Sequence, residues 1–189
     1  GDLMAYDQIN PNGRDKIPRS ARSTEPAWVT TVALPPETAP FDLQAAINAA
    51  GDGEPTVIEL NNDIILNGYD IKIPQDKIIK LTSAGAEITH SIDANRLFRV
   101  LSVSSQAALY LENIIITGGV GTDSGAGVSV FGGTLVMNNN AAITGNQASG
   151  AGAGVLIRNG GTFCMNGGEI TNNTAGTEGG GVNNGTGGI

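Results

Sequence analysis

The hydrophobic and polar positions in the C-terminal half of the chain recur with a period of about 27 residues. A fixed period of this length is the signature of a repeat architecture, in which each unit stacks on its neighbours. An earlier, more degenerate copy places Ile116 27 residues before Ile143, and Val100 28 residues before Val128. The positions that keep the 27-residue step are Gly127, Gly154 and Gly181, Val128, Val155 and Val182, Ile143 and Ile170, and Asn146 and Asn173.

Each period contains three short segments in which apolar residues alternate with polar or small ones, at 127–131, 134–138 and 141–144. Alternation with a period of two predicts strands that bury one face. Three strands per period predict a coil that pairs in parallel with the coil above it, about 4.8 Å away. The expected inward residues are Val128, Val130, Leu135, Met137 and Ile143, and one period later Val155, Ile157, Phe163, Met165 and Ile170.

This pattern predicts an all-β fold, a single-stranded parallel β-helix. Glycines between the strands fit turns with positive φ, and Asn146 stacked over Asn173 predicts a hydrogen-bonded ladder along the axis. A leucine-rich repeat needs several leucines and a helical side per repeat, and a β-sandwich has no fixed period. The calcium-binding nonapeptide motif is absent, so Asp123 alone is no calcium site.

The N-terminal part divides into an arm and a cap. Residues 1–40 hold six of the eight prolines and predict a proline-rich arm or linker, in which 28–32 is a candidate strand against the helix wall. Residues 41–55 predict a capping helix, whose apolar face covers the open end of the core. Residues 56–189 predict about five coils. The first strands are expected at 56–60, 63–66, 71–73, 78–82 and 86–89.

The C-terminal end of the sequence lies inside a third copy of the repeat, at Gly188-Ile189. We expect either that the native chain continues or that the last coil leaves an open sheet edge. An open edge predicts end-to-end self-association through residues 160–189, or fraying there.

Charge and composition narrow the partners. Charged residues make up 15% of the chain, against about 25% in an ordinary soluble domain. The net charge of −8 argues against nucleic acid and anionic membranes, and no apolar run is long enough to span a bilayer. The single cysteine, Cys164, permits no intrachain disulfide. The first residue is Gly1 rather than Met, which favours a chain trimmed behind a signal sequence.

Two sequence features resemble known β-helix proteins. The segment Leu-Gln-Ala-Ala-Ile-Asn-Ala-Ala at 43–50, followed by Val-Ile-Glu-Leu at 57–60, is similar to the entry of pectate-lyase-like right-handed β-helices. The Ile-Thr-x-Asn and Gly-x-Gly-Val segments of the repeats resemble those of bacterial surface and autotransporter-type β-helix proteins of the polymorphic outer-membrane type. The resemblance covers residues 41–189. It implies right-handed coils, as the crossover rule also does, and an extracellular or cell-surface location.

Candidate chemistry is sparse. His90, Asp93, Arg96 and Arg99 form the one polar cluster in the sequence, and solvated charge pairs are its favoured interpretation over a lyase-type base. Cys164 is expected to point outward without a basic neighbour that would activate it. The aromatic residues Trp28, Tyr69 and Tyr110 are too few for an aromatic sugar platform. No catalytic, cofactor-binding or metal-binding residue is therefore predicted.

The carboxylate motifs that the resemblance implies for a β-helix glycoside hydrolase are absent. Only Asp123, Arg158, Glu169 and Glu178 are charged after Gly119. The expected function is a noncatalytic secreted or cell-surface module, such as an adhesin, a carbohydrate-binding module or a stalk, whose partner is a polysaccharide or a cell-surface glycan. The alternative is a fragment of a polysaccharide lyase or glycoside hydrolase.

Overall fold

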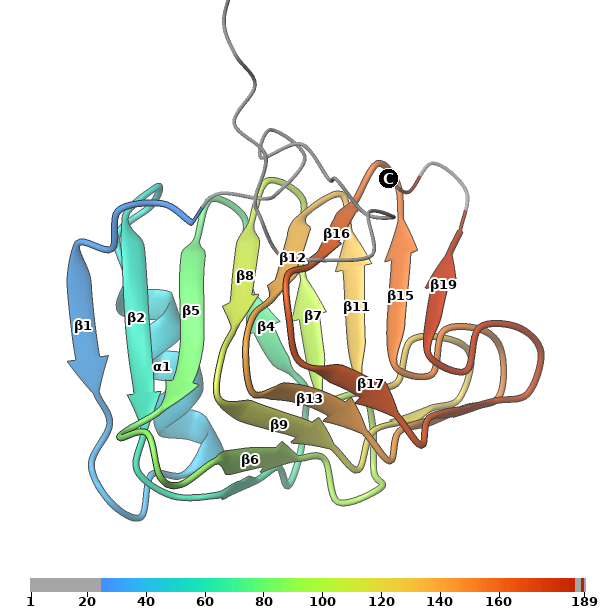
Figure 1. Cartoon of the computed structure of the whole chain (residues 1–189), viewed down its shortest axis with the longest axis horizontal. Coiled ribbons are helices and arrows are strands. Elements are labelled where there is room, and N and C mark those ends of the chain that lie inside the picture. The colour runs from blue at the N-terminus through green and yellow to red at the C-terminus, as the bar shows by residue number, and fades with distance from the viewer. Residues whose placement is uncertain (1–24, 186–187, 189) are drawn as a thin grey trace, which may run out of the picture.

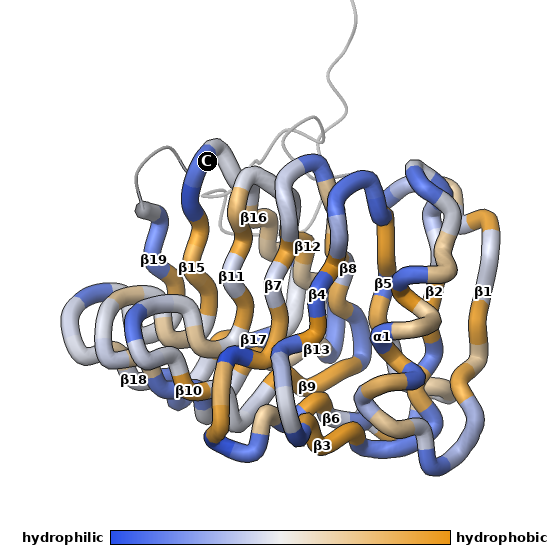
Figure 2. Tube along the Cα trace, turned by 180° about the vertical axis from the view of Figure 1, so that it is seen from behind, coloured by the Kyte–Doolittle hydropathy of each residue, from blue (hydrophilic) through white to orange (hydrophobic). Residues whose placement is uncertain are grey.

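The computed structural model describes residues 25–185 and residue 188, which form a parallel β-solenoid with one short helix (Figure 1). All pairs of strands are parallel in this part of the chain. The chain runs down the near side of the stack and up the far side as it advances from left to right, so the coils are right-handed (Figures 1 and 2). The predicted fold class is confirmed.

Four sheets run along the axis of the solenoid. Sheet 1 has six strands, sheets 2 and 3 have five each, and sheet 4 has three. Sheet 1 consists of β1 (Thr30–Ala33), β2 (Pro55–Leu60), β5 (Ile78–Ser83), β8 (Ala108–Leu111), β12 (Thr134–Met137) and β16 (Thr162–Met165). Sheet 2 consists of β3 (Ile64–Ile65), β6 (His90–Asp93), β9 (Ile114–Thr117), β13 (Ala141–Thr144) and β17 (Glu169–Thr171). Sheet 3 consists of β4 (Ile71–Ile73), β7 (Leu101–Val103), β11 (Val128–Phe131), β15 (Val155–Arg158) and β19 (Val182–Asn184). Sheet 4 consists of β10 (Val120–Gly121), β14 (Gln147–Ala148) and β18 (Thr174–Ala175).

The core is built from columns of apolar side chains, one residue per coil. The predicted valine and isoleucine columns are both present and extend further toward the N-terminus than the repeat pattern indicated. Their buried members are between 0 and 1% exposed, and the residues of the last coil, Ile170 and Val182, are the more exposed ones. In sheet 3 the column is Ile71, Leu101, Val128, Val155 and Val182, and in sheet 2 it is Ile64, Ile92, Ile116, Ile143 and Ile170.

Two details of the predicted register are wrong. Val100 does not stack under Val128, because Leu101 occupies that place in the ladder. The strand expected at 86–89 is a loop, and β6 begins only at His90, which brings Ile92 into the column between Ile64 and Ile116. Burial of isoleucine decides the register there, because a slip of one residue reverses which face is buried.

The helix α1 (Pro40–Ala49) closes the N-terminal end of the solenoid, as predicted, and contacts β4. Leu43 and Ile47 are fully buried against the core. The N-cap is Ala39, whose side chain cannot accept a hydrogen bond, and the carboxylate of Asp42 instead accepts the backbone N–H of Ala39 at 3.2 Å. Acid in the first turn also complements the helix dipole.

Gln44 completes this cap by closing the free edge of sheet 3. Its side-chain Oε1 accepts the N–H of Lys72 at 2.8 Å, and its Nε2 donates to the carbonyl of Lys72 at 3.0 Å. The side-chain amide thus takes the place of a peptide group of a neighbouring strand. Unpaired edges invite association with other chains, and this contact blocks one of them.

Part of the arm predicted at 1–40 belongs to the sheet. The strand expected at 28–32 is present as β1, which pairs in parallel with β2 and provides the sixth strand of sheet 1. Residues 1–24 of the arm lie outside the described residues. Residues 30–33 of the predicted arm are therefore part of the first turn of the solenoid.

Small residues form a separate layer at the corner beyond sheet 2. The strands of sheet 4 pack a cluster of alanines, and the glycine-rich loops after them project from the stack (Figure 2). At the same corner the predicted asparagine ladder is present. The Nδ2 group of Asn146 donates to Oδ1 of Asn173 at 3.0 Å, and Gly119 donates its N–H to Oδ1 of Asn146 at 2.8 Å.

Candidate functional site

The outer face of sheet 1 departs from simple alternation, because three consecutive side chains that point outward are buried. Lys80, Tyr110 and Val136 occupy one outward column and are 8, 7 and 0% exposed. On a solvated sheet the outward residues of such a column are exposed and polar. Something therefore covers this part of the face.

The cover includes the segment Glu25–Trp28, here called the strap, which precedes β1 and lies across the sheet. The Trp28 ring meets the Tyr110 ring edge to face, with centroids 5.1 Å apart, and Lys80 Nζ lies 4.9 Å from the centroid of the Trp28 ring. The carboxylate of Glu25 accepts hydrogen bonds from Trp28 Nε1 at 2.7 Å, Lys80 Nζ at 2.9 Å and Asn138 Nδ2.

Lys80 is the electrostatic centre of this face. Its ammonium lies 2.9 Å from Glu25 and 3.0 Å from Glu112, and its side chain is only 11% exposed. Burial lowers the pKa of Lys80, but the hydrogen bonds and charges of Glu25 and Glu112 outweigh burial and raise it above its ordinary value. Lys80 is therefore a fixed positive charge at neutral pH, which makes it unsuited to act as a general base.

Glu25 shows the complementary shift. Burial raises the pKa of Glu25, but the hydrogen bonds from Trp28, Lys80 and Asn138, together with the charge of Lys80, bring its pKa below the ordinary value. The strap is thus held by an ionised carboxylate that bridges β5 and the end of β12.

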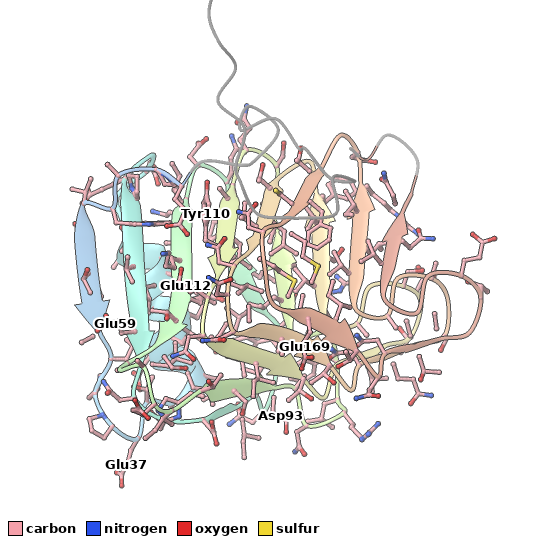
Figure 3. All side chains as sticks on the ribbon, in the orientation of Figure 1. Glu37, Glu59, Asp93, Tyr110, Glu112 and Glu169 are labelled. Carbon is pink, nitrogen blue, oxygen red and sulfur yellow. The ribbon has the colours of Figure 1, made fainter. Side chains whose placement is uncertain are left out.

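A groove of about 450 Å³ lies beside the strap on the same face. Figure 3 shows Glu59, Tyr110 and Glu112 on sheet 1, with Glu169 further along the axis. Lys80, which contacts Glu25 of the strap, and Glu112, which pairs with Lys80, both line the groove. The lining combines hydroxyl, amide and charged groups with a similar share of apolar surface: Thr31, Val57, Glu59, Lys80, Thr82, Ser83, Gly85, Ala86, Glu112, Asn113, Asn139 and Asn140.

A second groove of about 710 Å³ continues around the corner toward sheet 2. It shares Asn139 and Asn140 with the first groove and ends at Gly168 and Glu169 in the last coil. Together the two grooves draw residues from every turn between β1 and β17. The result is an elongated polar surface along the axis rather than a deep enclosed pocket.

The cluster expected from the sequence is not brought together as a site. His90 Nδ1 lies 3.4 Å from Oδ1 of Asp63. The carboxylate of Asp93 instead accepts the backbone N–H of Asn95 at 2.7 Å. Arg99 donates to the backbone carbonyls of Ser124 and Gly125, with Nη2 to Ser124 at 2.9 Å and Nε to Gly125 at 2.5 Å. These contacts differ from the expected charge pairs within the cluster, because His90 meets Asp63 of the preceding coil and Arg99 binds backbone carbonyls of the next one. Among the described residues, the side chain of Arg96 shares no contact partner with His90, Asp93 or Arg99.

The other candidates lie apart from the groove. Cys164 follows Val136 in the outward column and is partly exposed, and its Sγ lies 3.4 Å from Oδ1 of Asn166. Tyr69 is 47% exposed and lines a separate depression of about 270 Å³ beside Gln44 and Asn48 of α1. The aromatic residues therefore do not form one platform: Trp28 and Tyr110 meet, and Tyr69 lies elsewhere.

The strap and the charge cluster were not predicted from the sequence, because their members are far apart along the chain. Glu25 precedes Lys80 by 55 residues and Asn138 by 113. One signal was available: Lys80 interrupts an apolar strand, Ile-Ile-Lys-Leu, at an outward position. A cation in that context implies a carboxylate partner across the sheet.

Three comparisons, with protein-family models, curated proteins and solved structures, gave no match to this chain. Over residues 25–185, no helix is long and apolar enough to cross a membrane. In the same part of the chain, no group of three or more histidine, cysteine, aspartate or glutamate side chains is placed to hold a metal ion.

Proposed function

We propose that the protein is a noncatalytic glycan-binding module of the secreted or cell-surface β-helix type, and that the groove on sheet 1 is its binding surface. The observation that carries this proposal is the length and polarity of the groove. Hydroxyl, amide and carboxylate groups from successive turns line it, and these groups pair well with the hydroxyls of a sugar chain.

Other ligand classes fit this surface less well. Sites for small molecules are usually concave and mostly apolar, whereas this groove is open and polar. Nucleic acid needs a row of basic side chains. Among the described residues that line the two grooves, Lys80 is the one cation, and it is already paired with two carboxylates. An extended neutral chain that makes hydrogen bonds along several coils remains the best match.

The type of β-helix is part of the proposal. The Gly-x-Gly-Val repeats at 125–128 and 152–155 support a relation to bacterial surface β-helix proteins, and the helical entry supports the pectate-lyase-like type. A surface module of this kind acts outside the cell, as an adhesin or as a stalk that carries a glycan-binding face.

The second candidate is a polysaccharide-cleaving enzyme, because two carboxylates, Glu59 and Glu112, line the same groove. Hydrolysis of a glycosidic bond uses such a pair. Against it, Glu112 is engaged by Lys80, and the raised pKa of Lys80 disfavours lyase chemistry that starts with proton removal by an amine.

A glycan array followed by calorimetry tests the proposal. We expect binding to one class of polysaccharide, with affinity reduced about tenfold in Glu59→Ala, because a hydrogen bond to a charged group contributes roughly 1.5–3 kcal/mol. The matched control is Glu178→Ala, which removes the same side chain from a loop at the far end of the solenoid. Equal losses in both variants, or no binding by any glycan, contradict the proposal.

A further inference from the structure

The strap occupies an aromatic ring and two nitrogen donors on the outer face of sheet 1. The rings of Trp28 and Tyr110 meet edge to face, and two nitrogen donors form hydrogen bonds to the carboxylate oxygens of Glu25. The donors, Lys80 Nζ and Asn138 Nδ2, come from β5 and from the residue after β12. Aromatic rings with nearby donors suit ligands that have one apolar ring face and several oxygens.

This arrangement adjoins the groove directly. Lys80 faces Glu25 of the strap and also forms part of the groove lining, and Glu112 contacts the same ammonium from the groove side. Tyr110 neighbours Lys80 in the outward column of sheet 1, yet it is 7% exposed. Displacement of the Trp28 ring uncovers the side of the Tyr110 ring that it contacts, next to the groove.

We propose that Tyr110, Lys80 and Asn138 form an aromatic subsite for a sugar ring, which the strap occupies in this structure and must leave before a glycan fills the groove. This inference rests on the proposed function of the groove. The strap is then a ligand substitute supplied by the chain itself, and it sets the affinity for glycan by competition.

The contacts of the strap involve few groups. They are one edge-to-face ring pair, a cation–π contact of Lys80 with Trp28, and hydrogen bonds to the carboxylate of Glu25, whose side chain is 31% exposed. The anchored end is close by, because Val29 donates its N–H to the carbonyl of Pro55 at 2.9 Å and β1 follows. Movement about the Trp28–Val29 junction lifts the strap and leaves the sheet intact.

The protein contains one tryptophan, so Trp28 emission reports the strap directly. When glycan is titrated into the full chain, we expect Trp28 emission to shift to the red and its quenching by acrylamide to increase. Both changes should have the same midpoint as the binding isotherm measured by calorimetry. Glycan binding measured by calorimetry without a change in Trp28 emission or quenching overturns the inference.

Removing the ring tests the competition. Trp28→Ala is expected to bind the same glycan about tenfold more tightly, because a binding-competent state that is populated about one-tenth of the time weakens the apparent affinity tenfold. The control is Tyr69→Ala, an exposed aromatic outside the groove, for which unchanged affinity is expected. Weaker or unchanged binding by a folded Trp28→Ala overturns the inference.

The two proposals fail in different ways. If the wild-type protein and both variants bind no glycan, the proposed function fails and the inference with it. If the wild type binds and depends on Glu59, but Trp28→Ala binds no more tightly, the groove stands and only the covered subsite is lost.

Discussion

Asn146 and Asn173 satisfy the backbone at the same corner of two successive coils. Asn146 is 1% exposed, accepts the N–H of Gly119 and donates to the carbonyls of Ile116 and Thr144. The residue one period earlier is Gly119, so the ladder begins with a backbone N–H rather than a side chain. The asparagines therefore replace hydrogen bonds that the sharp turn denies the backbone.

Replacing Asn146 with alanine should lower the free energy of unfolding by about 3 kcal/mol, since each buried group left without a partner costs roughly 1–3 kcal/mol. The control is Asn166→Ala, an exposed residue that donates to Asn138, with an expected change below about 0.5 kcal/mol. Urea unfolding measures both. Similar values for the two variants contradict the ladder's contribution.

Truncating Ile143 tests the core columns. The side chain is 0% exposed between Ile116 and Ile170, so Ile143→Ala should cost about 2–5 kcal/mol of unfolding free energy. Thermal or denaturant unfolding gives the value. A loss below about 1 kcal/mol is incompatible with a packed isoleucine at this position.

The strap is an element whose stability depends on pH. The pKa of Glu25 in the docked strap lies below its ordinary value of 4.5, so the ionised carboxylate stabilises the docked strap. This stabilisation is fully present above pH 4.5 and is lost as the pH falls through the lower pKa of the docked state. Lys80, Glu112, Trp28 and Asn138 surround this carboxylate or its ion-pair partner. Trp28 emission should shift to the red on acidification below pH 4.5.

Glu25→Gln is the matched variant for this transition. It keeps the size of the side chain and removes the titrating group, so its Trp28 emission should already resemble the released strap at pH 7 and change little on acidification. Circular dichroism identifies any pH at which the solenoid itself unfolds. An acid transition of Trp28 that is identical in both proteins contradicts the assignment to Glu25.

The helix cap makes a second prediction at this scale. Gln44→Ala removes both hydrogen bonds to Lys72 and uncovers the edge of β4, so we expect a loss of about 1 kcal/mol and faster hydrogen exchange at the Lys72 amide. The control Gln75→Ala changes an exposed side chain that pairs with Gln106. Unchanged exchange at Lys72 rules out this edge contact.

For the whole molecule, the repeat period was enough to predict the parallel solenoid and the core columns, and the helical spacing of apolar residues predicted the capping helix. A fixed period can be read from the sequence alone, and the pairing of Val128 with Val155 and of Ile143 with Ile170 follows from it directly. The groove and the strap were not predicted, because Glu25, Lys80 and Glu112 lie in segments without a clean repeat. Their meeting depends on how the first coils stack, which the sequence pattern there did not reveal.

The glycines show the same limit. Gly125, Gly152 and Gly179 have positive φ, as a turn glycine is expected to have. Gly154 is required for a different reason: an added Cβ would lie 2.4 Å from the carbonyl oxygen of Gly181 in the next coil. Close stacking of coils, and not only the turn, therefore selects glycine at positions 127 and 154 of the 27-residue period.

The last described coil is more exposed than the coil before it. Met165 and Val182 are 47 and 36% exposed, whereas Met137 and Val155, their neighbours in the stack, are fully buried. We expect this sequence to self-associate through its last coil, with a mass that rises with concentration in light scattering. Met165→Lys should reduce the association, and a protein that stays monomeric at all concentrations contradicts it.

Chemical-shift mapping tests the groove most directly. The isotope-labelled protein is titrated with the glycan that binds it best, and the chemical shifts of the backbone amides are followed in every coil. The account predicts shifts at the groove residues, such as Thr82, Asn113 and Asn140, and at Trp28 as the strap lifts, with the opposite face around Tyr69 and Lys72 unchanged. Shifts confined to that opposite face or to the glycine-rich loops would contradict it.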